Sequence, residues 1–313
     1  MNSSTSSSRI AKKFWGSSIR SIFSPLLACL VLLGLYQALI FGGFISPTGG
    51  INQWQGNVIK AQQYAYDTNP TPKMVLVGSS LTSNIRAEYI GSQVANLGLA
   101  GGSTQTGLEI VKKKKSKPSI LLVEVNDTID RKIDGKLVDS LYQPLLHFAR
   151  MHLPIFKEEF KPVSVLISYF KNKYDENKKV TTNQNEDKEQ IKKSPARKKV
   201  IEKLVNENRK ELDQEVQDLL RKQAEYIKVQ IAEIKKDGVR VALFDVPGEP
   251  LVNNTLRKKQ VRELMRSLFP TDSFEWLQEP SREWVTSDGI HLIEADAKDY
   301  AAFLREQLLN TAS

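Results

Sequence analysis

Residues Lys73–Thr82 read KMVLVGSSLT, an apolar run that ends in a glycine and two serines. The near-continuous apolar character of KMVLV favours a strand buried on both faces of a parallel sheet over a strand with one face in water. A turn that leaves such a strand lies at the carboxyl edge of the sheet, where ligands bind in open α/β folds. Ser80 is therefore a candidate nucleophile, and a serine that merely caps the next helix is the alternative.

The same kind of segment recurs along the chain. Ser119–Val125 (SILLVEV) and Val239–Val246 (VRVALFDV) are apolar and rich in β-branched residues, and Gln93–Asn96 (QVAN) is a weaker fourth strand. Helical spacing of apolar residues lies between and after these strands, at Thr104–Lys114, most of Val200–Lys236, Leu256–Leu268 and Ile293–Leu309. Alternating strands and helices predict an α/β fold with a mostly parallel, doubly wound sheet.

The amino-terminal part of the chain predicts a membrane anchor. Pro25–Phe44 has twenty positions without a charge, which is enough to cross a hydrocarbon core of about 30 Å. Basic residues precede it at Arg9, Lys12, Lys13 and Arg20, and no charge follows closely, so the positive-inside rule places the amino terminus in the cytoplasm. A cleaved signal peptide is the alternative, but its apolar core is normally about 7–15 residues and no convincing cleavage site follows.

These observations divide the chain into a cytoplasmic tail (1–24), a transmembrane anchor (25–44), a linker (45–72) and a folded domain (73–313). The interval between Asn126 and Val239 is too long for one crossover helix, so we expect a charged helical insert at about 154–236. Inside it, Lys171–Lys199 has hardly any apolar residue and predicts a mobile loop. The rest fits an inserted helical cap as well as a long solvated helix.

The net charge of +9 is concentrated in this lysine-rich helical region. Solvated helices account for it, and none of the recognised nucleic-acid motifs occurs, so no nucleic-acid partner is expected. The chain has one cysteine, Cys29, which excludes an internal disulfide. His147 and His152 are five residues apart and do not share a helix face, so no metal or other cofactor is predicted.

Three further segments carry polar residues suited to acyl transfer. Asn96–Ser103 (NLGLAGGS) follows one predicted strand, Asn126 closes another, and Asp288 stands three residues before His291 in SDGIH. Each alone has an ordinary explanation as a loop, cap or turn. Together with Ser80 they can meet at one edge of one sheet, and they supply a nucleophile, oxyanion donors and an oriented base.

The order and spacing of GSSLT, NLGLAGGSTQTGL, EVNDT and SDGIHL resemble the four sequence blocks of the SGNH (GDSL-like) hydrolase superfamily. The resemblance covers roughly Lys73–Asp127 and Gly238–Leu309, and leaves out the anchor and the insert. It implies a three-layer α/β/α sandwich of flavodoxin-like type, to which this chain adds one transmembrane helix and a helical insertion.

The resemblance also implies roles for single residues. Ser80 would be the nucleophile, with Asp288 and His291 completing a catalytic triad. The N–H groups of Ser80 and Gly101 and the Asn126 amide would form the oxyanion hole. The Asn-x-x-x-x-Gly pattern of the second block indicates Gly101 rather than Gly98.

Two residues depart from the pattern of this family. Ser79 stands where an Asp usually precedes the nucleophile, and Glu124 stands where a Gly usually lies two residues before the Asn. Serine at the first position also occurs in membrane-anchored relatives that modify envelope polymers. Glu124 either narrows the pocket or points to the other face of its strand, which weakens the case for small free esters as substrates.

These features predict a serine-dependent acyl-ester hydrolase or O-acyltransferase of the SGNH type. It would act outside the cytoplasmic membrane, facing the periplasm or the exterior, on an acylated cell-envelope or extracellular polysaccharide. A multi-spanning acyltransferase would be a fitting partner. The alternative is a non-catalytic envelope scaffold that retains the fold and binds through its charged insert.

Overall fold

The computed structural model describes residues 7–66, 71–176 and 184–310, and in these residues the chain forms a five-stranded sheet. The strand order is β2-β1-β3-β4-β5, and every pairing is parallel. The strands are Met74–Gly78 (β1), Val94–Gly98 (β2), Ile120–Glu124 (β3), Arg240–Phe244 (β4) and Glu275–Trp276 (β5). The predicted α/β fold with a parallel sheet is confirmed, and the two-residue edge strand β5 is an addition to it.

Side chains along each central strand alternate between two buried clusters, one on each face of the sheet. In β1, Val75 and Val77 belong to the first cluster and Leu76 to the second. β3 and β4 follow the same rule. Because successive residues point to opposite faces and both faces are buried, these strands need apolar residues at every position.

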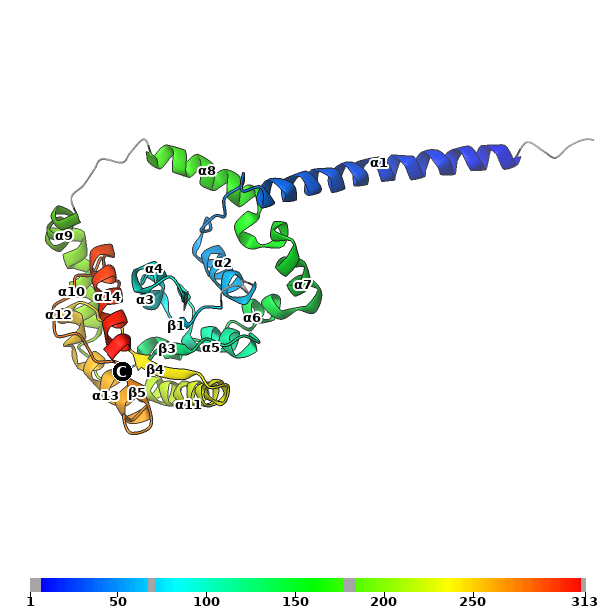
Figure 1. The fold of residues 1–313 in the computed structure, drawn as a ribbon. Helices are drawn as coiled ribbons and strands as arrows, with labels where there is room; N and C mark the ends of the chain where they lie inside the picture. The colour runs from blue at the N-terminus through cyan, green and yellow to red at the C-terminus, as the bar shows by residue number, and fades with distance from the viewer. Residues whose placement is uncertain (1–6, 67–70, 177–183, 311–313) are drawn as a thin grey trace, which may run out of the picture.

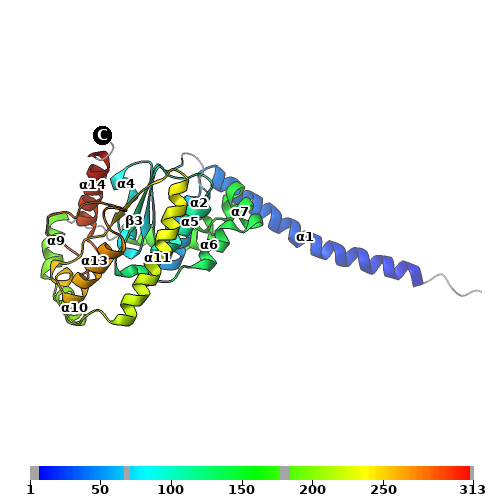
Figure 2. The same ribbon diagram turned by 90° about the horizontal axis from the view of Figure 1, so that it is seen from below.

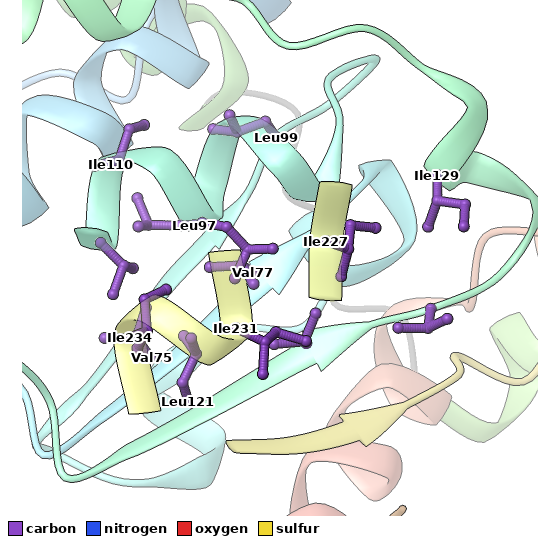
Figure 3. Close-up of a cluster of buried hydrophobic side chains, with 14 of the residues drawn as sticks. Val75, Val77, Leu97, Leu99, Ile110, Leu121, Ile129, Ile227, Ile231 and Ile234 are labelled. Atoms are coloured by element: carbon purple, nitrogen blue, oxygen red, sulfur yellow. The ribbon is translucent and has the colours of Figure 1, made fainter. Parts of the chain in front are cut away.

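The first face is covered mainly by α5 (Thr104–Lys113), α11 (Gln214–Lys236) and α13 (Leu256–Leu268). Figure 3 shows Ile227, Ile231 and Ile234 of α11 close to the side chains of the strands. The second face carries α4 (Ala87–Ile90) and α14 (Glu294–Asn310), whose side chains Ile90, Tyr300 and Leu304 join the second cluster.

Helix α11 corrects the predicted extent of the insert. It is the crossover helix that leads into β4, and Leu220, Ala224, Ile227, Ile231 and Ile234 are buried at steps of three or four residues. The prediction of an insert at 154–236 was therefore wrong at its carboxyl end. The additional elements lie between β3 and α11, and they are Asp127–Asp130 (η1), Gly135–Tyr142 (α6), Pro144–His152 (α7), Pro154–Phe156 (η2), Glu158–Phe160 (η3), Pro162–Glu176 (α8), Gln184–Lys193 (α9) and Pro195–Glu207 (α10).

The prediction of a mobile loop at Lys171–Lys199 was also wrong for the residues that the structure describes. Helices α8, α9 and α10 occupy those residues, while 177–183 lie outside the described part of the chain. The composition is poor in apolar residues, but Lys188 of α9 pairs with the buried Asp296 of α14 at 2.6 Å. This contact joins the highly charged helix α9 to the folded body.

The segment predicted as a linker, 45–72, holds the helix α2 (Gln53–Tyr66). Val58, Ala61 and Tyr64 of this helix are buried in the cluster on the first face. Polar residues between them hid the apolar side from a reading of composition alone. The folded domain therefore begins at α2, about twenty residues before the boundary placed at Lys73.

The amino-terminal helix α1 runs from Ser7 to Phe41, so it begins inside the segment predicted as a tail and ends before Phe44. Residues 1–6 lie outside the described chain. Within the described residues, Ser24–Phe41 is long and apolar enough to cross a membrane, and almost none of it is buried against the rest of the protein. Figures 1 and 2 show α1 projecting from the body.

Candidate active site

The turn after β1 places Ser80 at the carboxyl edge of the sheet. Ser79 caps the short helix α3 (Ser80–Ser83), and its Oγ accepts a hydrogen bond from the Leu81 N–H at 3.2 Å. Gly78 is required here, because a Cβ at this position would overlap Glu124 Oε2 and Thr82 Oγ1. Ser80 itself is half-buried, with its hydroxyl oxygen 3.0 Å from His291 Nε2.

The loop before α14 supplies the other two members of the predicted triad. Asp288 Oδ2 lies 2.7 Å from His291 Nδ1, while Oδ1 accepts the backbone N–H groups of Ile290 and His291 at 3.1 and 2.8 Å. Since the carboxylate can only accept, Nδ1 carries the proton and the free electron pair of Nε2 faces Ser80. The structure therefore brings Ser80, His291 and Asp288 together as the sequence predicts.

The carboxyl group of Asp288 is held in its ionised form. Burial would raise its pKa, but the hydrogen bonds from the His291 ring and from the backbone of His291 and Ile290 outweigh burial and lower the pKa to about 2. At neutral pH a charged Asp288 fixes the histidine tautomer that would suit a general base.

Helix α10 packs directly over the triad loop. Gly289 adopts φ +97°, and a Cβ there would lie 2.7 Å from Leu204 Cδ1 of α10, so both backbone and packing require glycine. On the same helix, Arg197 Nε donates to the Thr286 carbonyl at 2.6 Å and its guanidinium pairs with Glu249. The insert thus covers one side of the site, although α10 contributes none of the predicted catalytic groups.

The second sequence block lies beside the nucleophile turn. The Leu99 N–H donates to the Gly78 carbonyl at 3.0 Å, and Gly101 has φ +67° in the turn that the Gly102 N–H closes onto Leu99. Asn57 of α2 holds this loop through both the N–H and the carbonyl of Ala100, at 2.9 and 2.8 Å. A helix taken for a linker therefore shapes the predicted oxyanion loop.

One predicted oxyanion donor is free of protein acceptors. In the part of the chain that the structure describes, the Ser80 N–H donates to no protein group, as expected at the first position of a helix. This N–H is available to a ligand at the start of α3. The role predicted for Gly101 stays a prediction.

The Asn126 amide is engaged by two carboxylates. Its Nδ2 donates to Glu124 Oε1 at 2.8 Å and to Asp245 Oδ1 at 2.9 Å, which uses both of its N–H groups. Burial raises the pKa of Asp245 to about 7, with the Asn126 hydrogen bond opposing the rise and the Glu124 charge adding to it. To donate to an oxyanion, the Asn126 amide must first give up its hydrogen bond to one of these carboxylates. The predicted role of Asn126 therefore depends on this change of partner.

Glu124 is the residue near the site that the sequence did not identify as functional. Its buried carboxylate accepts the Ser79 N–H at 2.8 Å, the Ser79 hydroxyl at 2.7 Å and the Thr82 hydroxyl at 2.5 Å, besides the Asn126 amide. The carboxylate faces the turn that carries Ser79 and Ser80, and the expectation that Glu124 narrows the pocket stays a prediction. The available signal was a single carboxylate closing an otherwise apolar strand, SILLVEV.

This network predicts the effect of Glu124→Gln. The amide turns one acceptor oxygen into a donor that faces the N–H or hydroxyl groups of Ser79 and Thr82. Each hydrogen bond lost from a buried charged group costs about 1.5–3 kcal/mol, so we expect unfolding free energy to fall by about 3 kcal/mol. Chemical denaturation measures the fall, with Glu225→Gln on the exposed side of α11 as the matched control. Equal stability of the two variants would contradict the conclusion that the hydrogen bonds of Glu124 stabilise the turn after β1.

Comparison of the chain with family models, curated proteins and solved structures gave no match. The candidate site therefore rests on its geometry. Among the described residues, no group of three or more His, Cys, Asp or Glu side chains is arranged to hold a metal ion.

Proposed function

We propose that this protein is a membrane-anchored, serine-dependent acyl-ester hydrolase or O-acyltransferase of the SGNH type, built as a three-layer α/β/α sandwich. The observation that carries the proposal is the hydrogen-bonded chain from Ser80 Oγ through His291 to Asp288 at the carboxyl edge of a parallel sheet. The three residues come from opposite ends of the domain sequence, yet their distances are those of a nucleophile, a base and an orienting acid.

In the proposed mechanism, His291 Nε2 removes the proton of Ser80 as Oγ attacks the carbonyl carbon of an ester. The Ser80 N–H stabilises the resulting oxyanion, with Gly101 and Asn126 as the further donors. Collapse of the tetrahedral intermediate breaks the ester bond, and the departing alcohol takes the proton from His291. The same histidine then deprotonates water or a sugar hydroxyl as it attacks the acyl-enzyme. Collapse of this second intermediate breaks the bond between the acyl carbon and Ser80 Oγ, which takes the proton back from His291.

A short acyl group fits the small cavity that lies nearest to Ser80 along the chain. This cavity of about 30 Å³ is lined by Leu81, Asn126 and Ile290, which are sequence neighbours or predicted partners of the triad residues rather than the triad itself. This volume holds little more than one or two water molecules, which suits an acetyl group better than a fatty acyl chain. Helix α10, which packs against Gly289 of the loop that carries Asp288 and His291, would shield the site from water in the proposed transferase.

The amino-terminal helix supports a site of action at the cell envelope. We propose that α1 crosses the cytoplasmic membrane once, with basic residues on the cytoplasmic side and the catalytic domain outside. Both ribbon views support an outward-facing site, because α9 and α10 lie at the end of the body opposite α1. An acylated polysaccharide could reach such a site, and a multi-spanning acyltransferase in the same membrane could supply the acyl group.

The fate of the acyl-enzyme tests this proposal. The purified full-length protein is acetylated with an activated acetyl ester, and intact mass is followed with and without envelope glycans. We expect the acetyl-enzyme to persist in buffer and to discharge onto the glycan. Leu204→Ala, which thins the cover, should speed discharge to water, whereas Val200→Ala at an exposed position of α10 should not.

Two results would redirect the assignment. Equal rates of discharge with and without glycan, with free acid as the sole product, would make the protein an esterase without transferase activity. Failure of Ser80 to acquire any acyl group would contradict catalysis and favour a binding protein that retains the fold.

A further inference from the structure

We infer that helix α7 and the turn η2 after it form a second membrane contact, in which their apolar side chains lie in the interfacial layer of the bilayer beside α1. The inference rests on α1 crossing the membrane, which is part of the proposed function. The surface consists of Leu145, Phe148, Met151, Leu153 and Phe156, and we call it the α7 surface. Its occupant is the headgroup and upper acyl region of phospholipids.

Two hydrogen bonds to α1 fix the position of η2 along the axis of that helix, and so its depth relative to the membrane. The Ile155 N–H of η2 donates to Gln37 Oε1 of α1 at 3.0 Å, and the Tyr36 hydroxyl donates to the Phe160 carbonyl at 2.9 Å. Gln37 lies four residues before the end of the helix at Phe41, a distance of about 6 Å along the axis. If the final turn of α1 is in the membrane, η2 is level with it.

Helix α7 exposes its large apolar side chains, whereas a helix of a soluble domain buries them. None of its residues, Pro144–His152, is buried, and Leu145 and Phe148 are 80% and 64% exposed. Two of its polar residues face the body instead: Arg150 Nη1 donates to the Ser140 carbonyl at 2.8 Å, and His147 Nδ1 lies 3.0 Å from the Leu141 carbonyl. The exposed His152 lies against Phe148, with 4.6 Å between the ring centroids. A surface in contact with water disfavours so many exposed apolar side chains on one short helix, whereas a helix lying in a bilayer interface requires them.

Neighbouring aromatic residues and the arrangement of helices favour lipid as the occupant. Phe44, in the connection from α1 to α2, and Trp54, in the first turn of α2, are 81% and 60% exposed, as in the aromatic belt of a membrane protein. In Figures 1 and 2, α7 lies beside the carboxyl-terminal end of α1, whereas α9 and α10 lie at the far end of the body. The second contact would therefore hold the catalytic edge away from the bilayer.

A fluorescent probe in the full-length protein tests this inference. The protein is reconstituted in nanodiscs of phosphatidylethanolamine and phosphatidylglycerol, and an NBD label is quenched by nitroxide-bearing lipids. The native Cys29, the only cysteine in the sequence, reports on the anchor. In a Cys29→Ser background, Leu145→Cys and Phe148→Cys report on the α7 surface. Tyr226→Cys on α11, 62% exposed and apart from this surface, is the matched control.

We expect severalfold stronger lipid quenching at positions 145 and 148 than at 226, together with protection from aqueous iodide. Strong lipid quenching at Cys29 with only weak quenching at 145 and 148 would overturn the second contact and leave the anchor intact. Absence of lipid quenching at Cys29 would overturn the anchor, and the inference with it. Iodide quenching at 145 and 148 equal to that at 226 would identify a water-facing surface, open to a protein partner instead.

Discussion

Ser80→Ala should abolish covalent labelling by a fluorophosphonate probe and lower ester turnover by about 10⁶-fold, the usual cost of deleting a serine nucleophile. The reason is that the Ser80 hydroxyl lies 3.0 Å from His291 Nε2. The Ser79 hydroxyl donates to the Glu124 carboxylate instead of to an imidazole. Intact mass after incubation with the probe measures the labelled fraction. The substitution removes one oxygen from a half-buried position, so the fold should be retained.

Ser79→Ala is the matched control, one residue away on the same turn. The Ser79 hydroxyl is fully buried, donates to Glu124 Oε1 and accepts the Leu81 N–H. Its loss should cost stability of about 1 kcal/mol or more through the cap, while labelling of Ser80 persists. Labelling that survives in Ser80→Ala and disappears in Ser79→Ala would show that the nucleophile is assigned one residue too late.

The strands and the Asp288–His291 pair could be predicted because their signals are local, whereas the position of Ser80 beside His291, 211 residues away, followed from the expected meeting of these segments at one edge of the sheet. β1, β3 and β4 are apolar at nearly every position, since both faces of the sheet are buried. Asp288 and His291 are three residues apart, so one loop sets their geometry. β5 has only two residues and no apolar run, so nothing in its sequence distinguishes it from a loop.

The errors concern elements whose role depends on what they pack against. The buried stripe of α11 is present in the sequence, but periodicity does not tell whether a stripe meets the sheet or another helix of an insert. In α2, Asn57 holds Ala100, a contact across more than forty residues that no local pattern reveals. The contacts of Glu124 are also invisible in the local sequence, because the groups that donate to its carboxylate belong to the turn after another strand, β1.

Asp288→Asn should lower turnover by about 10⁴-fold while leaving the fold intact. Asparagine keeps an oxygen for the backbone N–H groups of Ile290 and His291, but it presents an NH₂ group to His291 Nδ1. The ring must then accept at Nδ1 and carry its proton on Nε2, where it cannot take the proton of Ser80. Steady-state hydrolysis of an activated acetyl ester measures the loss.

Asp299→Asn is the control, because it removes a carboxylate charge from α14, the helix that follows the loop of Asp288 and His291. Asp299 lies on α14, is exposed and pairs with Arg282 away from the triad, so its replacement should leave turnover nearly unchanged. A decrease of less than tenfold in Asp288→Asn would show that His291 holds its tautomer without Asp288. The triad would then reduce to a Ser80–His291 pair.

The acid dependence of stability gives a second, independent measure of Asp288. Its pKa is about 2 in the folded protein against an ordinary value of 3.8, so the ionised group stabilises the fold above pH 3.8. That contribution is lost as the pH falls from 3.8 towards 2, because protonation removes the charge that His291 and the two N–H groups bind. Asp288→Asn cannot lose this contribution and should therefore show a shallower fall in thermal stability across that interval than the parent protein. If the melting temperatures of the two proteins fell equally between pH 4 and pH 2, Asp288 would not be held by these hydrogen bonds in solution. This conclusion would hold whatever the effect of the substitution on turnover.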